Sequence, residues 1–275
     1  MKRVLITGGA GELGREMVNL LRAQDYTVRV MSRRSRPATQ PPAIEWAQAD
    51  LGAGSGISEA VAGVDTIVHA ATNFLSSGKV DVAGTKRLLD AARAAGVSHV
   101  LYVSIVGIER NPFAYYQNKL KAEALVRESG IPWSIQRAAQ FHPFIDVILR
   151  LFVHWPVALL PSDFQFQTMD MREAAGRMVE SVIAGPAGWL PDIGGPEVRT
   201  LGDLAKPWMR ARGLRRPIVH LPLPGKTAAA FRNGYITCPE HKDGKITWEE
   251  WLQETYGQNP AAASPYVARY LRRSA

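Results

Sequence analysis

Apolar runs and amphipathic stretches alternate through the first half of this 275-residue chain. Val4, Leu5 and Ile6 form an apolar run typical of a buried strand, and from Glu12 onward apolar residues recur at helical spacing. The same pattern predicts further strands at 27–31, 44–49, 65–71, 100–103 and 131–137, and helices at 57–62, 80–95 and 115–129. This order predicts an α/β fold, a doubly wound parallel sheet covered by helices on both faces.

Glycines fill the turn between the first strand and the first helix. Gly9, Gly11 and Gly14 have the spacing GxGxxG, and Gly8 adds the spacing GxxGxxG. Glycine allows a tight turn, close approach of backbone to a pyrophosphate, and close packing of helix on sheet, and the helix N–H groups then face the phosphates. We expect a Rossmann-type dinucleotide site here, with a merely structural turn as the alternative; its residues are Thr7, Gly8, Gly9, Gly11, Glu12, Leu13 and Gly14.

The end of the second predicted strand indicates which dinucleotide binds. NAD-specific folds place an acid there for the ribose hydroxyls, whereas a nearby arginine accommodates the 2′-phosphate of NADP. This chain has Ser32, Arg33 and Arg34 and no acid. A guanidinium pairs with phosphate where a carboxylate repels it, so we predict NADP(H), with a solvated arginine turn as the alternative. At the next strand end, Asp50 and Leu51 offer a carboxylate that either binds the adenine amino group or caps a helix.

The carboxyl ends of the next two strands offer further candidates. The small residues Ala70 and Ala71, followed by Thr72, let the cofactor lie against the backbone. Ser104 ends the fifth strand, at the edge where open α/β sheets bind ligands, and its hydroxyl can polarise a substrate carbonyl.

Tyr115 and Lys119 are four residues apart and therefore share one face of the following helix. A nearby ammonium favours phenolate, which lowers the pKa of a tyrosine from about 10 and makes it a usable proton donor near neutral pH. Because Tyr-x-x-x-Lys also occurs by chance, an ordinary pair on the helix surface is the alternative.

In this order, the motifs resemble the short-chain dehydrogenase/reductase superfamily, in its atypical NmrA-like, NAD(P)H-binding branch. The matching segments are 7–14, 68–71, 81–85, 103–104, 115–119 and 130–141, and the resemblance covers most of residues 1–185. It implies that Tyr115 is the general acid/base, that Lys119 orients the nicotinamide ribose and tunes Tyr115, and that Ser104 positions the carbonyl. Two features depart from the pattern: Asp81 replaces the usual asparagine of extended members, and the adjacent Tyr116 is an alternative to Tyr115.

Aromatic residues gather just after the sixth predicted strand. Most of them are expected in the core, but their position makes them candidates for the wall and lid of an apolar pocket: Phe141, His142, Phe144, Phe152, Trp155 and Phe164. For His142 a structural histidine is the alternative. Beyond a short strand at 167–170, helices are predicted at 171–184, 200–212, 226–234 and 247–256, with Thr200 as a cap and a capping box at Thr247. We predict an NADP-binding domain at 1–140 plus about 167–185, and a smaller substrate-binding or lid region at 141–166 and 186–275.

Composition limits the partners. The net charge is +8, but lysines and arginines are scattered, so no nucleic-acid partner is expected. One cysteine excludes an internal disulfide and a cysteine-based metal site, which fits a cytoplasmic protein without metal. The most apolar region, 141–161, is too interrupted to span a membrane. The oligomeric state is left open.

These features lead to three hypotheses. The first is an NADP(H)-dependent oxidoreductase that transfers hydride to or from a small, largely apolar carbonyl or enone. The second is a non-catalytic NADP(H)-binding redox sensor or regulatory protein, because the NmrA-like branch contains such members. The third is an epimerase or lyase-like enzyme that retains its cofactor.

Overall fold

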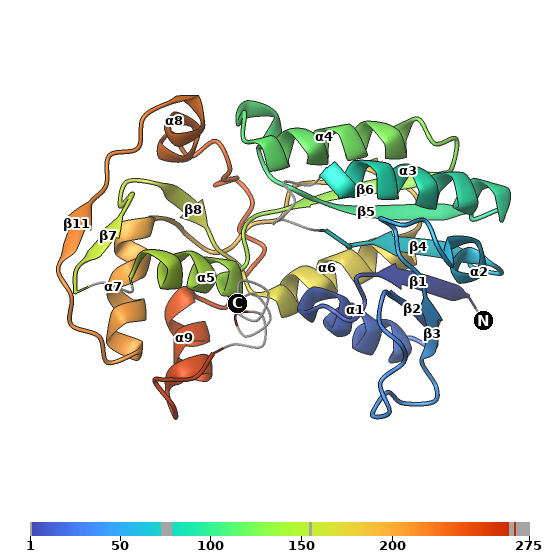
Figure 1. The fold of residues 1–275 in the computed structure, drawn as a ribbon, viewed down its shortest axis with the longest axis horizontal. Helices are drawn as coiled ribbons and strands as arrows, with labels where there is room; N and C mark the ends of the chain where they lie inside the picture. The colour runs from blue at the N-terminus through green and yellow to red at the C-terminus, as the bar shows by residue number, and fades with distance from the viewer. Residues whose placement is uncertain (1, 73–78, 154–155, 264–266, 268–275) are drawn as a thin grey trace. The chain divides into compact units, whose positions relative to one another are not determined.

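The computed structural model describes residues 2–72, 79–153, 156–263 and 267 (Figure 1). The chain forms two compact units. Unit 1 contains Met1–Ile105, Phe113–Arg137 and Ala174–Pro191, and unit 2 contains Val106–Pro112, Ala138–Glu173 and Asp192–Ala275.

Unit 1 is built on a seven-stranded sheet with the order β3-β2-β1-β4-β5-β6-β9. The strands are β1 (Arg3–Thr7), β2 (Thr27–Ser32), β3 (Glu45–Gln48), β4 (Thr66–His69), β5 (His99–Ile105), β6 (Trp133–Ala138) and β9 (Gly188–Trp189). The pairings of β1 with β2 and β4, of β2 with β3, of β4 with β5 and of β6 with β9 are parallel. The predicted α/β fold with a mostly parallel, doubly wound sheet is confirmed.

Helices cover both faces of this sheet. They are α1 (Glu12–Arg22), α2 (Ile57–Val61), α3 (Lys79–Ala94), α4 (Ala114–Arg127) and α6 (Met171–Ala184). Figure 1 shows α3 and α4 on one face and α1 and α6 on the other. Val4, Leu5 and Ile6 are each 0% exposed, because a strand covered on both faces buries every side chain.

Strand β4 is shorter than the predicted 65–71. It ends at His69, and the Ala71 N–H then donates to Thr7 Oγ1 at 3.1 Å instead of joining a sheet ladder. The two-residue strand β9 was not predicted.

Unit 2 combines helices with two small sheets. The helices are α5 (His142–Phe152), α7 (Leu201–Ala211), α8 (Lys226–Arg232) and α9 (Trp248–Tyr256), with a 3-10 turn η2 (Ile108–Arg110). Strand β8 (Gln165–Gln167) pairs antiparallel with β10 (Val198–Thr200), and β7 (Ala158–Leu160) pairs in parallel with β11 (Ile218–His220). The short strand expected at 167–170 lies at β8 instead.

Capping signals in unit 2 are confirmed, whereas one helix was not predicted. Thr200 accepts the Asp203 N–H at the start of α7, and Thr247 forms the capping box of α9. The unpredicted helix is α5, whose segment was treated as an aromatic wall. Its buried carboxylate Asp146, 0% exposed, accepts hydrogen bonds from Trp208 Nε1 and the Tyr256 hydroxyl, both at 2.6 Å.

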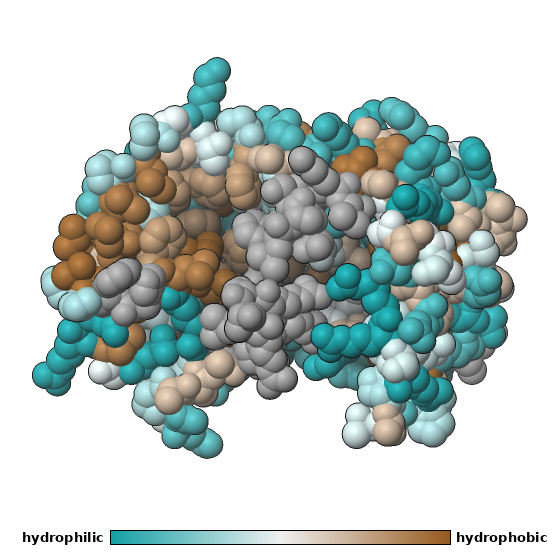
Figure 2. Space-filling model, viewed as in Figure 1, coloured by the Kyte–Doolittle hydropathy of each residue, from teal (hydrophilic) through white to brown (hydrophobic). Residues whose placement is uncertain are grey.

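Apolar side chains of β7 and β11 reach the surface of unit 2. Leu159 and Val219, which are register partners, are 39% and 43% exposed, and Figure 2 shows a hydrophobic patch over these strands. Among the described residues, every helix is too short or too polar to cross a bilayer.

Candidate active site

The glycine loop between β1 and α1 is tightly packed. Gly8 has φ +72°, and a Cβ there would lie 3.0 Å from the Cα and the N of Ala71, two residues beyond the end of β4. A Cβ at Gly14 would collide with the Gly8 carbonyl oxygen and lie 2.6 Å from Gly9 Cα. The first and last glycines therefore hold the loop and the helix closer together than any side chain permits.

Helix α1 begins without a side-chain cap. Gly11 is its N-cap, and the Gly11 N–H donates back to the Gly8 carbonyl at 2.7 Å. The N–H groups of the first helical turn have no intrahelical acceptors and are available to phosphate oxygens at the positive end of the helix dipole. The loop and the helix start therefore fit a dinucleotide pyrophosphate.

A buried network of side-chain hydrogen bonds centred on His69 supports this loop. The two ring nitrogens of His69, at the end of β4, lie 2.7 Å from Thr7 Oγ1 and 2.8 Å from Thr85 Oγ1 on α3. Burial, together with the positive charge of Lys119, lowers the pKa of His69 from 6.5 to about 3. His69 is therefore neutral at physiological pH and ties β1, β4 and α3 together.

The arginine turn after β2 is held by its backbone. Trp46 Nε1 donates to the Arg34 carbonyl at 2.9 Å, and the Arg34 N–H donates to Ser32 Oγ at 3.1 Å. The side chains of Arg33 and Arg34 are exposed, and neither forms an ion pair with a carboxylate in the described part of the chain. Two cationic groups on an anchored turn fit a 2′-phosphate.

Asp50 does not cap the next helix, so that alternative is wrong. Its carboxylate accepts the N–H of Gly52 at 2.7 Å within its own turn, while the N-cap of α2 is Gly56 and has no side-chain bond. Leu51 is partly buried and packs against the core of unit 1. The adenine-binding role of Asp50 stays a prediction.

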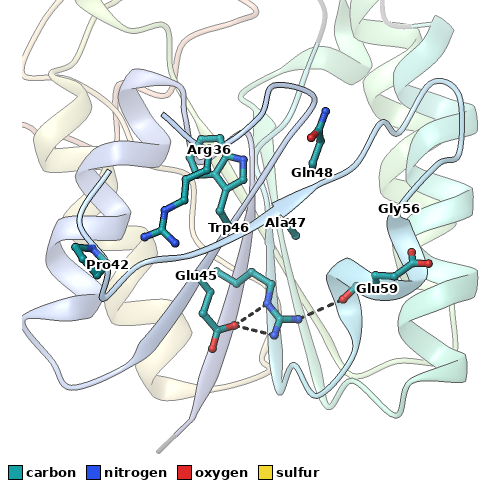
Figure 3. A pocket seen from close by; sticks show the side chains of 9 residues that line it. Arg36, Pro42, Glu45, Trp46, Ala47, Gln48, Gly56 and Glu59 are labelled. Carbon is teal, nitrogen blue, oxygen red and sulfur yellow. Dashed lines mark hydrogen bonds and ion pairs between the residues drawn. The ribbon is translucent and has the colours of Figure 1, made fainter. Parts of the chain in front are cut away.

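A pocket of about 570 Å³ opens beside β3 (Figure 3) and is separate from the predicted site. Arg29 and Glu45 form an ion pair at 2.7 Å on its wall, so these charges already satisfy each other. None of the predicted site residues lines it; its lining is Arg29, Arg36, Pro42, Glu45, Trp46, Ala47, Gln48, Gly56 and Glu59.

Tyr115 and Lys119 lie on the buried face of α4, and each is 6% exposed. Burial excludes an ordinary pair on the helix surface. Lys119 Nζ donates to the Val103 carbonyl at 2.7 Å and lies 4.2 Å from the centre of the Tyr102 ring. Burial lowers the pKa of Lys119 from 10.5 to about 8, against the opposing charges of Asp81 and Glu123.

The Tyr115 hydroxyl points to the carboxyl end of the sheet. It lies 2.9 Å from Thr72 Oγ1, three residues beyond the end of β4. The rings of both Tyr115 and Tyr116 pack edge-on against Phe113, with ring centres 6.5 and 5.3 Å apart. The hydroxyl contact with Thr72 favours Tyr115 as the tyrosine of the site.

Ser104 carries a buried hydroxyl. The residue is 2% exposed, and its Oγ makes no hydrogen bond within the described residues. By strand alternation it shares a sheet face with Tyr102, above which the Lys119 ammonium lies. A buried hydroxyl without a hydrogen bond costs free energy, so a ligand atom that bonds to it recovers this free energy on binding.

The predicted substrate residues belong to unit 2, whereas Ser104, Tyr115 and Lys119 belong to unit 1. Phe141, Phe144 and Phe152 are partly buried, Phe164 stacks on Phe231 with ring centres 5.2 Å apart, and Trp155 lies outside the described residues. Their contact with a substrate stays a prediction.

His142 is enclosed within unit 2. Its Nε2 donates to the Ile246 carbonyl at 3.2 Å, the rings of Trp248 and Trp251 flank it, and burial lowers its pKa to about 4. This geometry favours the structural histidine that the sequence left as an alternative.

Two comparisons with known sequences bear on this site. Residues 8–143 match the sequence model of a family described as NAD(P)H-binding. The matched range contains the glycine loop, Ser104, Tyr115 and Lys119, so the expected resemblance to an NAD(P)H-binding family is confirmed.

Curated relatives of this chain include reductases. A (4-alkanoyl-5-oxo-2,5-dihydrofuran-3-yl)methyl phosphate reductase of Streptomyces griseus is 30% identical over 141 residues, which cover 50% of this chain and 48% of that protein. A 4-hydroxy-2-methyl-3-oxo-4-farnesyl-3,4-dihydroquinoline-1-oxide ketoreductase of Stigmatella aurantiaca is 26% identical over 83% of this chain and 78% of that protein. The chain spans less than half the length of the first curated relatives that it matches.

Solved structures show the same fold. An NADPH-dependent quinone oxidoreductase of Escherichia coli, in complex with NADPH, superposes with a TM-score of 0.75. It is 18% identical and covers 91% of this chain and 99% of that chain. At this identity the likeness shows the fold alone.

Proposed function

We propose that this protein is an NADP(H)-dependent oxidoreductase that transfers hydride to or from a small, largely apolar carbonyl or enone. The observation that carries the proposal is the buried pair on α4: the Tyr115 hydroxyl lies 2.9 Å from Thr72 Oγ1, beyond the carboxyl end of β4, and the Lys119 ammonium donates to the Val103 carbonyl on β5. Desolvation of a charge costs several kcal/mol, so buried ionisable groups with shifted pKa values cluster at functional sites.

The cofactor would be held by three parts of unit 1. The N–H groups at the start of α1 and the loop at Gly8 would bind the pyrophosphate, Arg33 and Arg34 would bind the 2′-phosphate, and Lys119 would orient the nicotinamide ribose. NADPH, when bound, supplies a hydride from C4 of its nicotinamide ring.

The residues on α4 and β5 supply the proton chemistry. In the reductive direction, Tyr115 gives its proton to the carbonyl oxygen while the carbonyl carbon accepts the hydride. The positive charge of Lys119, whose pKa is about 8 and which is therefore protonated at pH 7, stabilises the phenolate that remains. The unpartnered Ser104 hydroxyl donates a hydrogen bond to the same carbonyl oxygen and polarises it.

The relatives support the substrate class. The Stigmatella aurantiaca protein is a ketoreductase of a farnesylated quinoline oxide, and the Escherichia coli protein is a quinone oxidoreductase. Both substrates named there are carbonyl compounds with extended conjugated or apolar parts.

The test is a fluorescence titration with NADPH and NADH, followed by a panel of ketones, enones and quinones with the cofactor that binds. Tyr115→Phe should retain NADPH binding and lose about 10²–10⁴-fold in turnover, because the proton donor is removed. Tyr116→Phe is the matched control and should lose far less. Wild-type turnover in Tyr115→Phe contradicts the assignment, and tight NADPH binding without turnover on any substrate points to the sensor alternative.

A further inference from the structure

Tyr115 is connected to Asp81 through Thr72. Thr72 Oγ1 donates to Asp81 Oδ2 at 2.6 Å, and the same Oγ1 lies 2.9 Å from the Tyr115 hydroxyl. A threonine hydroxyl has a single proton, and an ionised carboxylate only accepts. With its proton on Asp81 Oδ2, Thr72 Oγ1 keeps lone pairs that can accept from the Tyr115 hydroxyl.

This chain of bonds leads from the interior to water. Tyr115 is 6% exposed, Asp81 at the start of α3 is half-buried, and Thr72 is exposed. Charged and titratable groups of the described residues near Tyr115 include Lys119, Glu123 and Tyr116 on the same helix and Tyr102 on β5, and all four are buried. Among the described residues, Lys119 Nζ makes its hydrogen bond to the Val103 carbonyl.

A tyrosine that gives a proton in every turnover must regain one before the next. In the proposed reaction, the phenolate has little direct contact with bulk water, because Tyr115 is only 6% exposed. Its hydrogen bond to Thr72 is a short route to a group that exchanges with solvent.

We propose that Thr72 and Asp81 form a proton route between Tyr115 and water; this inference rests on the proposed function. In reduction, the Tyr115 O–H bond breaks as its proton passes to the carbonyl oxygen. Thr72 then gives its hydroxyl proton to the phenolate and takes one from Asp81, which receives a proton from hydronium or a buffer acid. The substrate gains one hydride and one solvent proton, and the protein returns to its starting charge. In oxidation the proton leaves by the same route.

Thr72 and Asp81 act through Tyr115 and are positioning residues. This role differs from a purely structural one, in which the two residues only stabilise the turn after β4. Loss of a structural contact slows the first and all later turnovers equally. A proton route affects the steady state, in which Tyr115 must be reprotonated, more than the first turnover, which begins with Tyr115 already protonated.

The experiment compares single-turnover and steady-state rates at saturating NADPH. In Thr72→Val, which has the shape of threonine without the hydroxyl, the ratio of steady-state to single-turnover rate should fall at least about tenfold. Small buffer acids such as imidazolium should restore it in proportion to their concentration. Asp81→Asn should behave similarly, and Thr72→Ser should recover the ratio because the hydroxyl returns. Thr66→Val, at the other end of β4, is the matched control.

Two results overturn the proposal and are distinguishable. If the wild-type protein binds NADPH and turns over nothing, the proposed function fails and the proton route fails with it. If the wild-type protein turns over and Thr72→Val keeps the wild-type ratio, or slows both rates equally without rescue by buffer acids, the proton route alone is wrong.

Discussion

Lys119 should make the fold less stable at neutral pH than a neutral side chain in its place. It is 6% exposed, and its pKa is lowered from 10.5 to about 8 because burial strips water from the ammonium. At about 1.36 kcal/mol for each pKa unit, this difference corresponds to about 3 kcal/mol. Protonation of Lys119 in the folded state is therefore less favourable than in the unfolded chain by roughly this amount.

The number of protons bound in the folded and unfolded states determines how stability changes with pH. Between pH 8 and pH 10.5 the unfolded chain holds a proton on Lys119 and the folded protein does not, so stability rises with pH in this window. Below pH 8 Lys119 is protonated in both states, so its contribution to the free energy of unfolding does not change with pH. Relative to Lys119→Met, the wild-type protein should therefore gain about 3 kcal/mol from pH 8 to pH 10.5.

The assay is urea unfolding followed by far-UV circular dichroism at pH 7, 8, 9 and 10 for both proteins. At pH 7 the variant should be more stable by about 1–2 kcal/mol, since the loss of the hydrogen bond to the Val103 carbonyl offsets part of the gain. Lys121→Met, at an exposed position of the same helix, is the control and should show no such window. A wild-type-minus-variant difference that is flat from pH 8 to pH 10 refutes the reasoning.

Three further predictions concern cofactor binding and acid stability. Arg33→Asp combined with Arg34→Ser should shift selectivity from NADPH toward NADH in titrations, because a carboxylate repels the 2′-phosphate. The control Arg93→Asp, at an exposed position, should leave the selectivity unchanged. Unchanged selectivity in the double variant contradicts the NADP assignment. Gly14→Ala should weaken NADPH binding and lower the free energy of unfolding by about 1–3 kcal/mol, because its Cβ collides with the loop backbone; an undiminished unfolding midpoint contradicts this. The pKa of His69 is lowered to about 3, so the folded state resists the proton that the unfolded state takes up below pH 6.5. Between pH 6.5 and pH 5 the free energy of unfolding of the wild-type protein should fall by about 2 kcal/mol relative to that of His69→Gln, as measured by urea unfolding. If the free energies of the two proteins change in parallel with pH, this prediction is wrong.

The elements of unit 1 were predictable because their signals are local. A strand buried on both faces is a continuous apolar run, as at Val4, and a helix that packs one face on a sheet repeats apolar residues at its own period. The glycine loop and the caps at Thr200 and Thr247 are set by residues three or four positions apart. Such patterns are present in the sequence before any tertiary contact forms.

The errors arose where a neighbour far along the chain decided the outcome. The strand at 65–71 stops at His69 because Ala71 bonds to Thr7, and Asp50 closes its own turn rather than capping α2. Helix α5 is buried around Asp146, whose partners on α7 and α9 lie 62 and 110 residues away. An aromatic-rich segment alone does not reveal such a polar centre.

For the candidate site, the sequence determined the residue types and their order: a glycine loop, an arginine turn, a serine at a strand end, and a tyrosine four residues before a lysine. The tertiary structure alone decided that Lys119 is buried, that the Ser104 hydroxyl finds no partner among the described residues, and that Tyr115 bonds to Thr72, 43 residues earlier in the chain. Spacing along one helix is a property of the helix. Desolvation of a charge and the direction of a hydrogen bond depend on which strands and helices surround it, and only the folded sheet brings these together.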